Sequence, residues 1–164
     1  MYGAALSQYA TYLDDVSGET IQEDIESVIN NDTLDNTEKS TLVNARVGQG
    51  GFRQQLIDHW QGCALTGFND TRFLVASHIK PWRESDNRER LDGYNGLLLL
   101  PNLDKVFDLG FVTFKATGDI RISKMLENKA LLGLSKDMQI RLSDAHQDYM
   151  EFHREHVFEK RCGS

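Results

Sequence analysis

The sequence predicts an α+β protein in which a strand-strand-helix unit and a short β-hairpin lie between helical segments. Residues 72–79 alternate in polarity and lead to Pro81, and proline favours the end of a strand because it removes a backbone donor. Residues 96–100 form a second apolar, strand-like run. Pro101 can then open a helix that runs to about Leu109, where a glycine follows.

Residues 1–48 form an acidic leader with short helical patterns. Apolar residues recur there at helical spacing, first at Ala5, Tyr9, Tyr12 and Leu13 and then at Ile21, Ile25, Val28 and Ile29. Short amphipathic helices need a partner surface. We therefore expect the leader either to pack on residues 49–164, which form the main domain, or to pair with a second copy of the chain in a homodimer.

One helix and one short strand are predicted between the leader and the strand-strand-helix unit. Three glycines precede a pattern that places Phe52, Leu56 and Trp60 on one helical face. Residues 62–68 are apolar and bounded by glycines, which favours a short strand entering a turn.

The last third of the chain predicts a hairpin and two helices. Residues 111–114 and 119–122 alternate around a turn that contains a glycine, so we expect a hairpin that extends the sheet. Residues 135–142 and 144–159 have helical patterns.

Composition sets the broad class of the protein. With 40% hydrophobic and 26% charged residues, the chain resembles an ordinary soluble domain. No apolar run approaches the ~18 residues that cross a bilayer, and residues 1–15 lack the features of a signal peptide, so we expect a cytoplasmic protein. Cys63 and Cys162 are far apart and neither belongs to a CxxC pair, so no structural zinc is expected.

The net charge of −7 is unevenly distributed. Residues 1–40 contain nine acids and one base, so residues 41–164 contain 16 acids and 17 bases and are close to neutral. Because phosphate neutralisation supplies most sequence-independent affinity for nucleic acid, a near-neutral domain binds DNA weakly by itself.

The candidate site lies between His78 and Asp108. His78 ends the first predicted strand, and its ordinary pKa of about 6.5 allows a neutral ring that can act as a base. Asp104 and Asp108 are one helical turn apart, so their carboxylates share a face and repel each other unless a cation lies between them. Hard oxygen ligands suit Mg²⁺, which we expect, or Mn²⁺ as the alternative.

This layout, with Asn95 between the histidine and the aspartates and with its HIKPW and NGLLLLP contexts, resembles the HNH endonucleases, also called ββα-metal or His-Me finger nucleases. The flanking GQGGFR and CALTG segments are similar to the restriction-associated branch of that family. The resemblance implies a ββα-metal core with motif residues 72–114. It also implies that His78 is the general base, that Asn95 orients it or helps hold the metal, and that the two aspartates lie near the metal.

One position departs from the family pattern. The residue before the general base is commonly Asp or His and binds metal in many HNH enzymes, whereas this chain has Ser77, a poor ligand. The resemblance therefore implies a metal site that lacks the usual protein ligand at this position.

We expect a metal-dependent DNA endonuclease that makes one single-strand cut per active site and serves restriction or another defence against foreign DNA. The loop after the histidine supplies candidate DNA contacts at Lys80, Arg83, Arg88 and Arg90. The acidic leader also suggests that the chain could belong to a longer protein with a separate DNA-recognition domain. The alternatives are a DNA-binding or assembly module with a degenerate HNH centre and, disfavoured by the missing CxxC pairs, a zinc-stabilised interaction domain.

Overall fold

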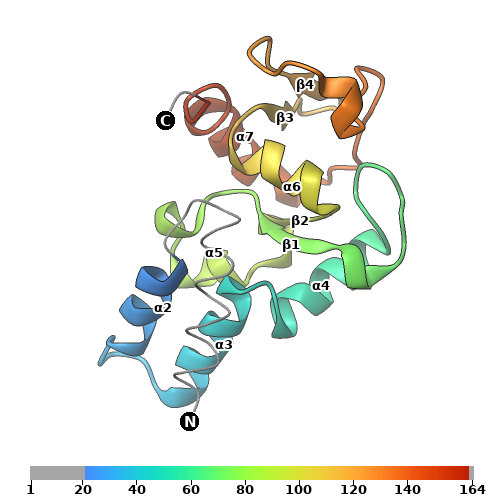
Figure 1. The fold of residues 1–164 in the computed structure, drawn as a ribbon. Coiled ribbons are helices and arrows are strands. Elements are labelled where there is room, and N and C mark those ends of the chain that lie inside the picture. The colour runs from blue at the N-terminus through green and yellow to red at the C-terminus, as the bar shows by residue number, and fades with distance from the viewer. Residues whose placement is uncertain (1–20, 163–164) are drawn as a thin grey trace.

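The computed structural model describes residues 21–162 (Figure 1). Two antiparallel strands, β1 (Val75–His78) and β2 (Gly96–Leu99), pair so that His78 lies opposite Gly96. Helix α6 (Pro101–Asp108) follows β2 and packs on β1. The predicted strand-strand-helix unit is therefore confirmed, whereas the helical pattern predicted near Ala5 lies outside the described residues.

The sequence of α6 explains both its bounds and its orientation. Pro101 occupies the first turn, where its missing N–H costs no helical hydrogen bond. Leu103, Val106 and Phe107 form the buried side of the helix. The opposite side therefore carries the predicted aspartates, Asp104 and Asp108, which are both half-buried.

The leader helices α2 (Ile21–Ile29) and α3 (Asn36–Arg46) belong to the same hydrophobic core as the strands. Helix α3 begins with a capping box, in which Asp35 and Glu38 each accept the other's backbone N–H. The buried apolar residues of these helices include Ile25, Val28 and Leu42. The apolar side of α2 thus packs on α3, which in turn packs on α4 and α5.

Helix α4 (Gly50–Trp60) packs against β2 on one face of the first sheet. Its residues Phe52 and Leu56 are buried and approach the strand closely. A Cβ atom at Gly96 would lie 2.7 Å from Leu56 and 2.8 Å from Phe52. Only glycine at this position lets the helix pack so closely against the residue that pairs with His78.

The C-terminal part forms a second layer above α6 (Figure 1). The hairpin of β3 (Val112–Phe114) and β4 (Ile120–Ile122) is confirmed, but it makes a separate two-stranded sheet and does not extend the first one. Helix α7 (Gln147–His156) packs on β3. Helix α6 lies between β1 and β3, and this explains the separation of the two sheets.

Two predictions of regular structure were wrong. Residues 135–142 are not a helix, because their backbone groups bond to the hairpin instead: Ile120 donates its N–H to Met138, and Ile140 donates to Gly118. Residues 62–68 form a tight turn rather than a strand, because Cys63 donates its N–H to the carbonyl of Phe68.

Short helices complete the described chain. They are α5 (Asn87–Leu91) and the 3₁₀ turns η1 (Thr71–Phe73), η2 (Trp82–Glu84), η3 (Gly93–Asn95), η4 (Lys129–Leu132) and η5 (Asp144–His146). Between residues 21 and 162, no helix has both the length and the apolar character that crossing a membrane requires.

Two histidines are fully enclosed in the C-terminal layer. His153 accepts a hydrogen bond from Thr113 and donates one to the carbonyl of Phe107, and burial lowers its pKa to about 3. His146 accepts from the backbone N–H of Ser143, and burial lowers its pKa to about 4. Both rings are therefore neutral in the folded protein at pH 7.

These depressed pKa values predict that acid destabilises the fold well before the carboxylates titrate. In the unfolded chain both histidines have pKa values of about 6.5, so between about pH 6.5 and 4 they bind protons there but not in the folded protein. The free energy of unfolding is therefore highest above pH ~6.5 and decreases as pH falls towards 4. Each of the two should remove about 2 kcal/mol from the free energy of unfolding by pH ~5. Urea denaturation across this pH range measures the decrease in the free energy of unfolding. His153→Gln should make this decrease smaller, whereas His156→Gln, at an exposed histidine, should leave it unchanged. Equal stability at both ends of the range would contradict the prediction.

Candidate active site

A cleft of about 580 Å³ opens between β1, α6 and the turn that joins α3 to α4. His78, Asp104 and Asp108 all line it, so the structure brings three of the four central predicted residues to one cavity. The charged side chains that line the cleft comprise five bases and two acids, namely Arg46, Arg53, Arg72, Lys105 and Arg161 against the two aspartates. The cleft of this acidic chain is thus basic, as a site for a polyanion requires.

His78 is held from three directions at the end of β1. Its ring stacks on Phe52 of α4, with ring centroids 4.1 Å apart and an interplanar angle of 3°, and the edge of Trp82 lies 5.6 Å away. Its Nε2 lies 2.9 Å from the carbonyl oxygen of Arg90. Because a carbonyl oxygen only accepts, Nε2 carries the proton of the neutral ring, and Nδ1 keeps the lone pair that a base needs.

The surroundings of His78 keep its ring uncharged. The pKa of His78 is lowered to about 4, chiefly by burial; the hydrogen bond to the Arg90 carbonyl opposes this shift, and the positive charges of Arg46 and Arg90 add to it. At pH 7 the ring is therefore neutral and able to accept a proton.

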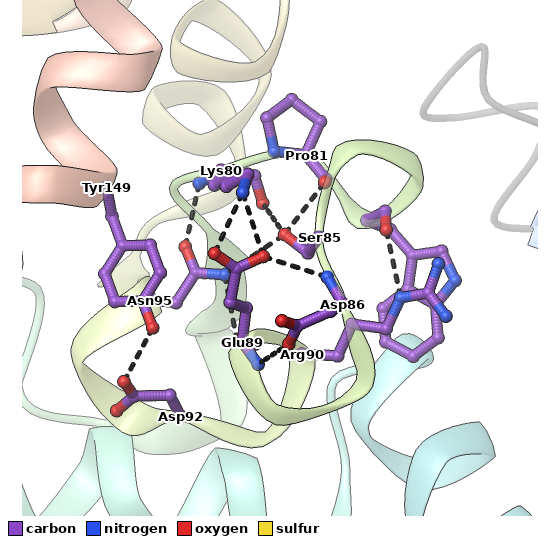
Figure 2. Close-up of polar contacts among 10 residues, drawn as sticks. Lys80, Pro81, Ser85, Asp86, Glu89, Arg90, Asp92, Asn95 and Tyr149 are labelled. Atoms are coloured by element: carbon purple, nitrogen blue, oxygen red, sulfur yellow. Dashed lines mark hydrogen bonds and ion pairs between the residues drawn. The ribbon is translucent and has the colours of Figure 1, made fainter.

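Asn95 is fully buried, and its side chain bonds to the linker between the two strands (Figure 2). Its Oδ1 accepts the backbone N–H of Lys80 at 2.8 Å, and its Nδ2 donates to the carbonyl of Glu89 at 3.0 Å and to Ser85 Oγ at 3.4 Å. The side chain thus ties together both ends of the linker between the strands. Since Glu89 directly precedes Arg90, Asn95 positions the carbonyl that holds the imidazole.

Several contacts between side chains stiffen the same linker. Lys80 Nζ forms an ion pair with Glu89 at 2.8 Å, and Glu89 also accepts the N–H of Asp86 in the capping box of α5 (Figure 2). The guanidinium of Arg90 lies 4.4 Å from the centre of the Trp82 ring and donates to the Trp82 carbonyl. The polar loop predicted from the sequence is therefore an ordered part of the site.

Three of the four predicted DNA-binding residues bind to other parts of the protein. Lys80 and Arg90 hold the linker, and Arg83 forms ion pairs with Glu23 and Asp24 of α2. Arg88 is exposed and lines a second hollow, of about 320 Å³, on another part of the surface.

Asp104 and Asp108 are the carboxylates of the cleft that could hold a metal ion. Within residues 21–162, no three His, Cys, Asp or Glu side chains lie close enough together to hold a metal ion. Ser77 lines the cleft, and its buried Oγ has no hydrogen-bond partner among the described residues. Two carboxylates of one helix suit Mg²⁺, which keeps several waters and commonly completes its shell with substrate phosphate.

Some residues that shape the site gave little signal in the sequence. Phe52 was placed on a helical face, but nothing indicated that it would stack on His78. The glycine after Asn95 was the available clue, because a missing side chain in a strand marks a close approach. Arg53 also shapes the site, because it donates to the backbone carbonyls of Leu74 and Thr71.

The comparison with protein families agrees with this geometry. Residues 63–115 match the sequence model of a family described as HNH endonuclease. Over these residues the chain is similar to HNH endonucleases. The match includes β1, the linker, β2 and α6, whereas it does not identify the restriction-associated branch. A comparison with curated proteins found no match.

The hydrogen bonds of Asn95 predict a large loss of stability when its side chain is truncated. Asn95→Ala leaves the buried backbone groups of Lys80 and Glu89 without their partner, so the free energy of unfolding should fall by about 2 kcal/mol or more. Asn102→Ala is the matched control, because this exposed amide makes one bond, to the Leu132 carbonyl, and its loss should cost under ~1 kcal/mol. Urea denaturation compares the two, and equal losses would contradict the assigned role.

Proposed function

We propose that the protein is a metal-dependent DNA endonuclease that hydrolyses one strand per active site. The observation that carries this proposal is the state of His78, a neutral imidazole whose Nε2 is fixed by a carbonyl and whose ring lines a basic cleft. The HNH match of residues 63–115 supports nuclease chemistry in general.

In the proposed reaction, Nδ1 of His78 takes a proton from a water molecule as its oxygen attacks the phosphorus. The bond between phosphorus and the 3′ oxygen breaks, and the leaving oxygen receives a proton from solvent. The hydrogen bond from Nε2–H to the Arg90 carbonyl stabilises the imidazolium that forms, because a positively charged donor strengthens the bond. Basic side chains such as Lys105 face the charge that develops on the phosphate.

Asp104 and Asp108 are the residues that would hold the divalent ion, Mg²⁺ or alternatively Mn²⁺. Bound there, the ion would neutralise charge on the phosphate and on the leaving oxygen. The carboxylates fit this role because they line the same cleft as His78 and lie one turn apart on α6.

The restriction or defence role and the recognised DNA belong to the same proposal. They rest on the similarity of the GQGGFR and CALTG segments to the restriction-associated branch. Cutting both strands would need two copies of the chain, or two successive cuts. The apolar side of α2 packs within its own core, so a homodimer would have to use another surface.

A DNA-binding or assembly module with a degenerate HNH centre is the second candidate. Two observations favour it: Ser77 Oγ is buried, and residues 21–162 contain no cluster of three metal ligands. Incubation of the protein with supercoiled plasmid, with Mg²⁺, with Mn²⁺ and without metal, separates the two candidates. Nicked product that depends on metal supports the endonuclease, and binding without product supports the module.

Substitution of the base tests the proposed reaction directly. His78→Ala should lower the rate of plasmid nicking by at least ~100-fold, the low end of what a positioned base contributes. His59→Ala, which alters an exposed histidine of α4, is the control and should keep the parental rate. Melting curves of both variants exclude unfolding as the cause. A His78 variant that folds and nicks DNA at the parental rate would place the base elsewhere.

The metal assignment is tested through both activity and stability. Asp104→Asn should raise the Mg²⁺ concentration needed for half-maximal nicking, and the double variant with Asp108→Asn should be inactive. Because a cation that binds only the folded state stabilises it by mass action, Mg²⁺ or Mn²⁺ should raise the melting temperature of the parent but not of the double variant. A double variant that keeps the metal-dependent rise would show that the ion binds elsewhere.

A further inference from the structure

The edge of the cleft carries an exposed aromatic ring beside an exposed guanidinium. Turn η1 presents Arg72, whose side chain is 83% exposed, and Phe73, which is 56% exposed. Both residues line the same cleft as His78. Large apolar side chains on a surface are notable when they adjoin a cavity, because such a setting marks a binding surface more often than an isolated exposed residue does.

The backbone beneath these two side chains is fixed by hydrogen bonds. Arg53 of α4 donates to the carbonyl of Leu74 at 2.8 Å and to that of Thr71 at 2.6 Å, which anchors both ends of the turn. Asp70 caps the turn by accepting the N–H of Arg72 at 3.1 Å, and it also binds the Arg72 guanidinium at 2.6 Å. The turn is therefore a preorganised support and not a loose loop.

A second ring supports the exposed one. Phe68 contacts Phe73 edge to face, with centroids 5.9 Å apart, and is itself 43% exposed. The edge-to-face contact fixes the angle between the two rings, and Phe73 remains 56% exposed and accessible to a further planar group. The pair thus forms an aromatic step, defined here as Phe68 and Phe73, at the mouth of a basic cleft.

The ligand that fits an aromatic step, a guanidinium and a basic cleft is a polynucleotide. A nucleobase has a flat face that stacks on phenylalanine, and its phosphates attract arginine. In an intact duplex both faces of each base are covered by neighbouring bases, so a ring outside the helix reaches a face only where a base is unpaired. This constraint narrows the substrate class.

We infer that Phe73, supported by Phe68, stacks on an unpaired nucleobase next to the phosphate in the cleft, while Arg72 contacts an adjoining phosphate. The preferred substrate is then DNA with unpaired nucleotides at the cut, such as a single strand or a gapped duplex. This inference rests on the proposed function for the identity of the ligand, but stacking itself requires no cleavage.

Binding without divalent metal tests the stacking separately from catalysis. The probe is a single-stranded DNA oligonucleotide that contains 2-aminopurine, whose fluorescence falls when it stacks on an aromatic ring. With EDTA present, the parent should quench the probe, and Phe73→Ala should bind it roughly 5- to 100-fold more weakly, the range of one base-aromatic stack. Phe73→Trp should restore both signals. Leu131→Ala, which removes an apolar side chain that is 86% exposed outside the cleft, is the matched control and should behave as the parent.

The experiments give different results if Phe73 stacks on a base, if it contacts another copy of the chain, or if the protein is not a nuclease. The effect of Phe73→Ala should be smaller on a fully paired duplex of the same sequence, and an equal effect overturns the preference for unpaired bases. Unchanged binding and quenching overturn the stacking, as does a change confined to oligomeric state in light scattering, which would mark a protein contact. Failure of the proposed function appears elsewhere, as absence of nicking by the parent with metal.

Discussion

The hydrogen bond between Nε2 of His78 and the carbonyl of Arg90 is the constraint around which the site is built. It fixes the tautomer of the ring, and so decides which nitrogen faces the chemistry. A backbone carbonyl serves this purpose only while its own loop is rigid. Asn95 supplies that rigidity, because its amide bonds Lys80, two residues after the end of β1, and Glu89, the residue before Arg90.

The same imidazole requires a close approach on its other side. Phe52 can lie flat against His78 because Gly96, the strand partner of the histidine, has no side chain to push α4 away. This packing also removes water from one face of the ring, which contributes to the burial that lowers the pKa of His78. Packing and protonation state are therefore set by one contact.

The elements predicted correctly are those whose signals are local. Pro101 and the polarity alternation before His78 identify α6 and β1, and the spacing of Asp104 from Asp108 places both on one face. Residues 135–142 misled because apolar spacing does not reveal whether a backbone bonds within its own segment or to a distant hairpin. The Arg90 carbonyl was also beyond prediction, since a backbone acceptor has no side-chain signature in the sequence.

The acidic leader has a specific electrostatic role in the folded chain. Asp24 of α2 is buried and bonds both Arg46 at 2.9 Å and Arg83 at 2.8 Å. Arg46 and Arg90 both lie over the ring of Trp82, at 5.7 and 4.4 Å, so two cations share one aromatic surface beside His78. Like charges held this close need a counter-charge, which Asp24 provides. Part of the leader's negative charge therefore lies inside the fold. There it offsets the repulsion between the arginines that lie next to the proposed base.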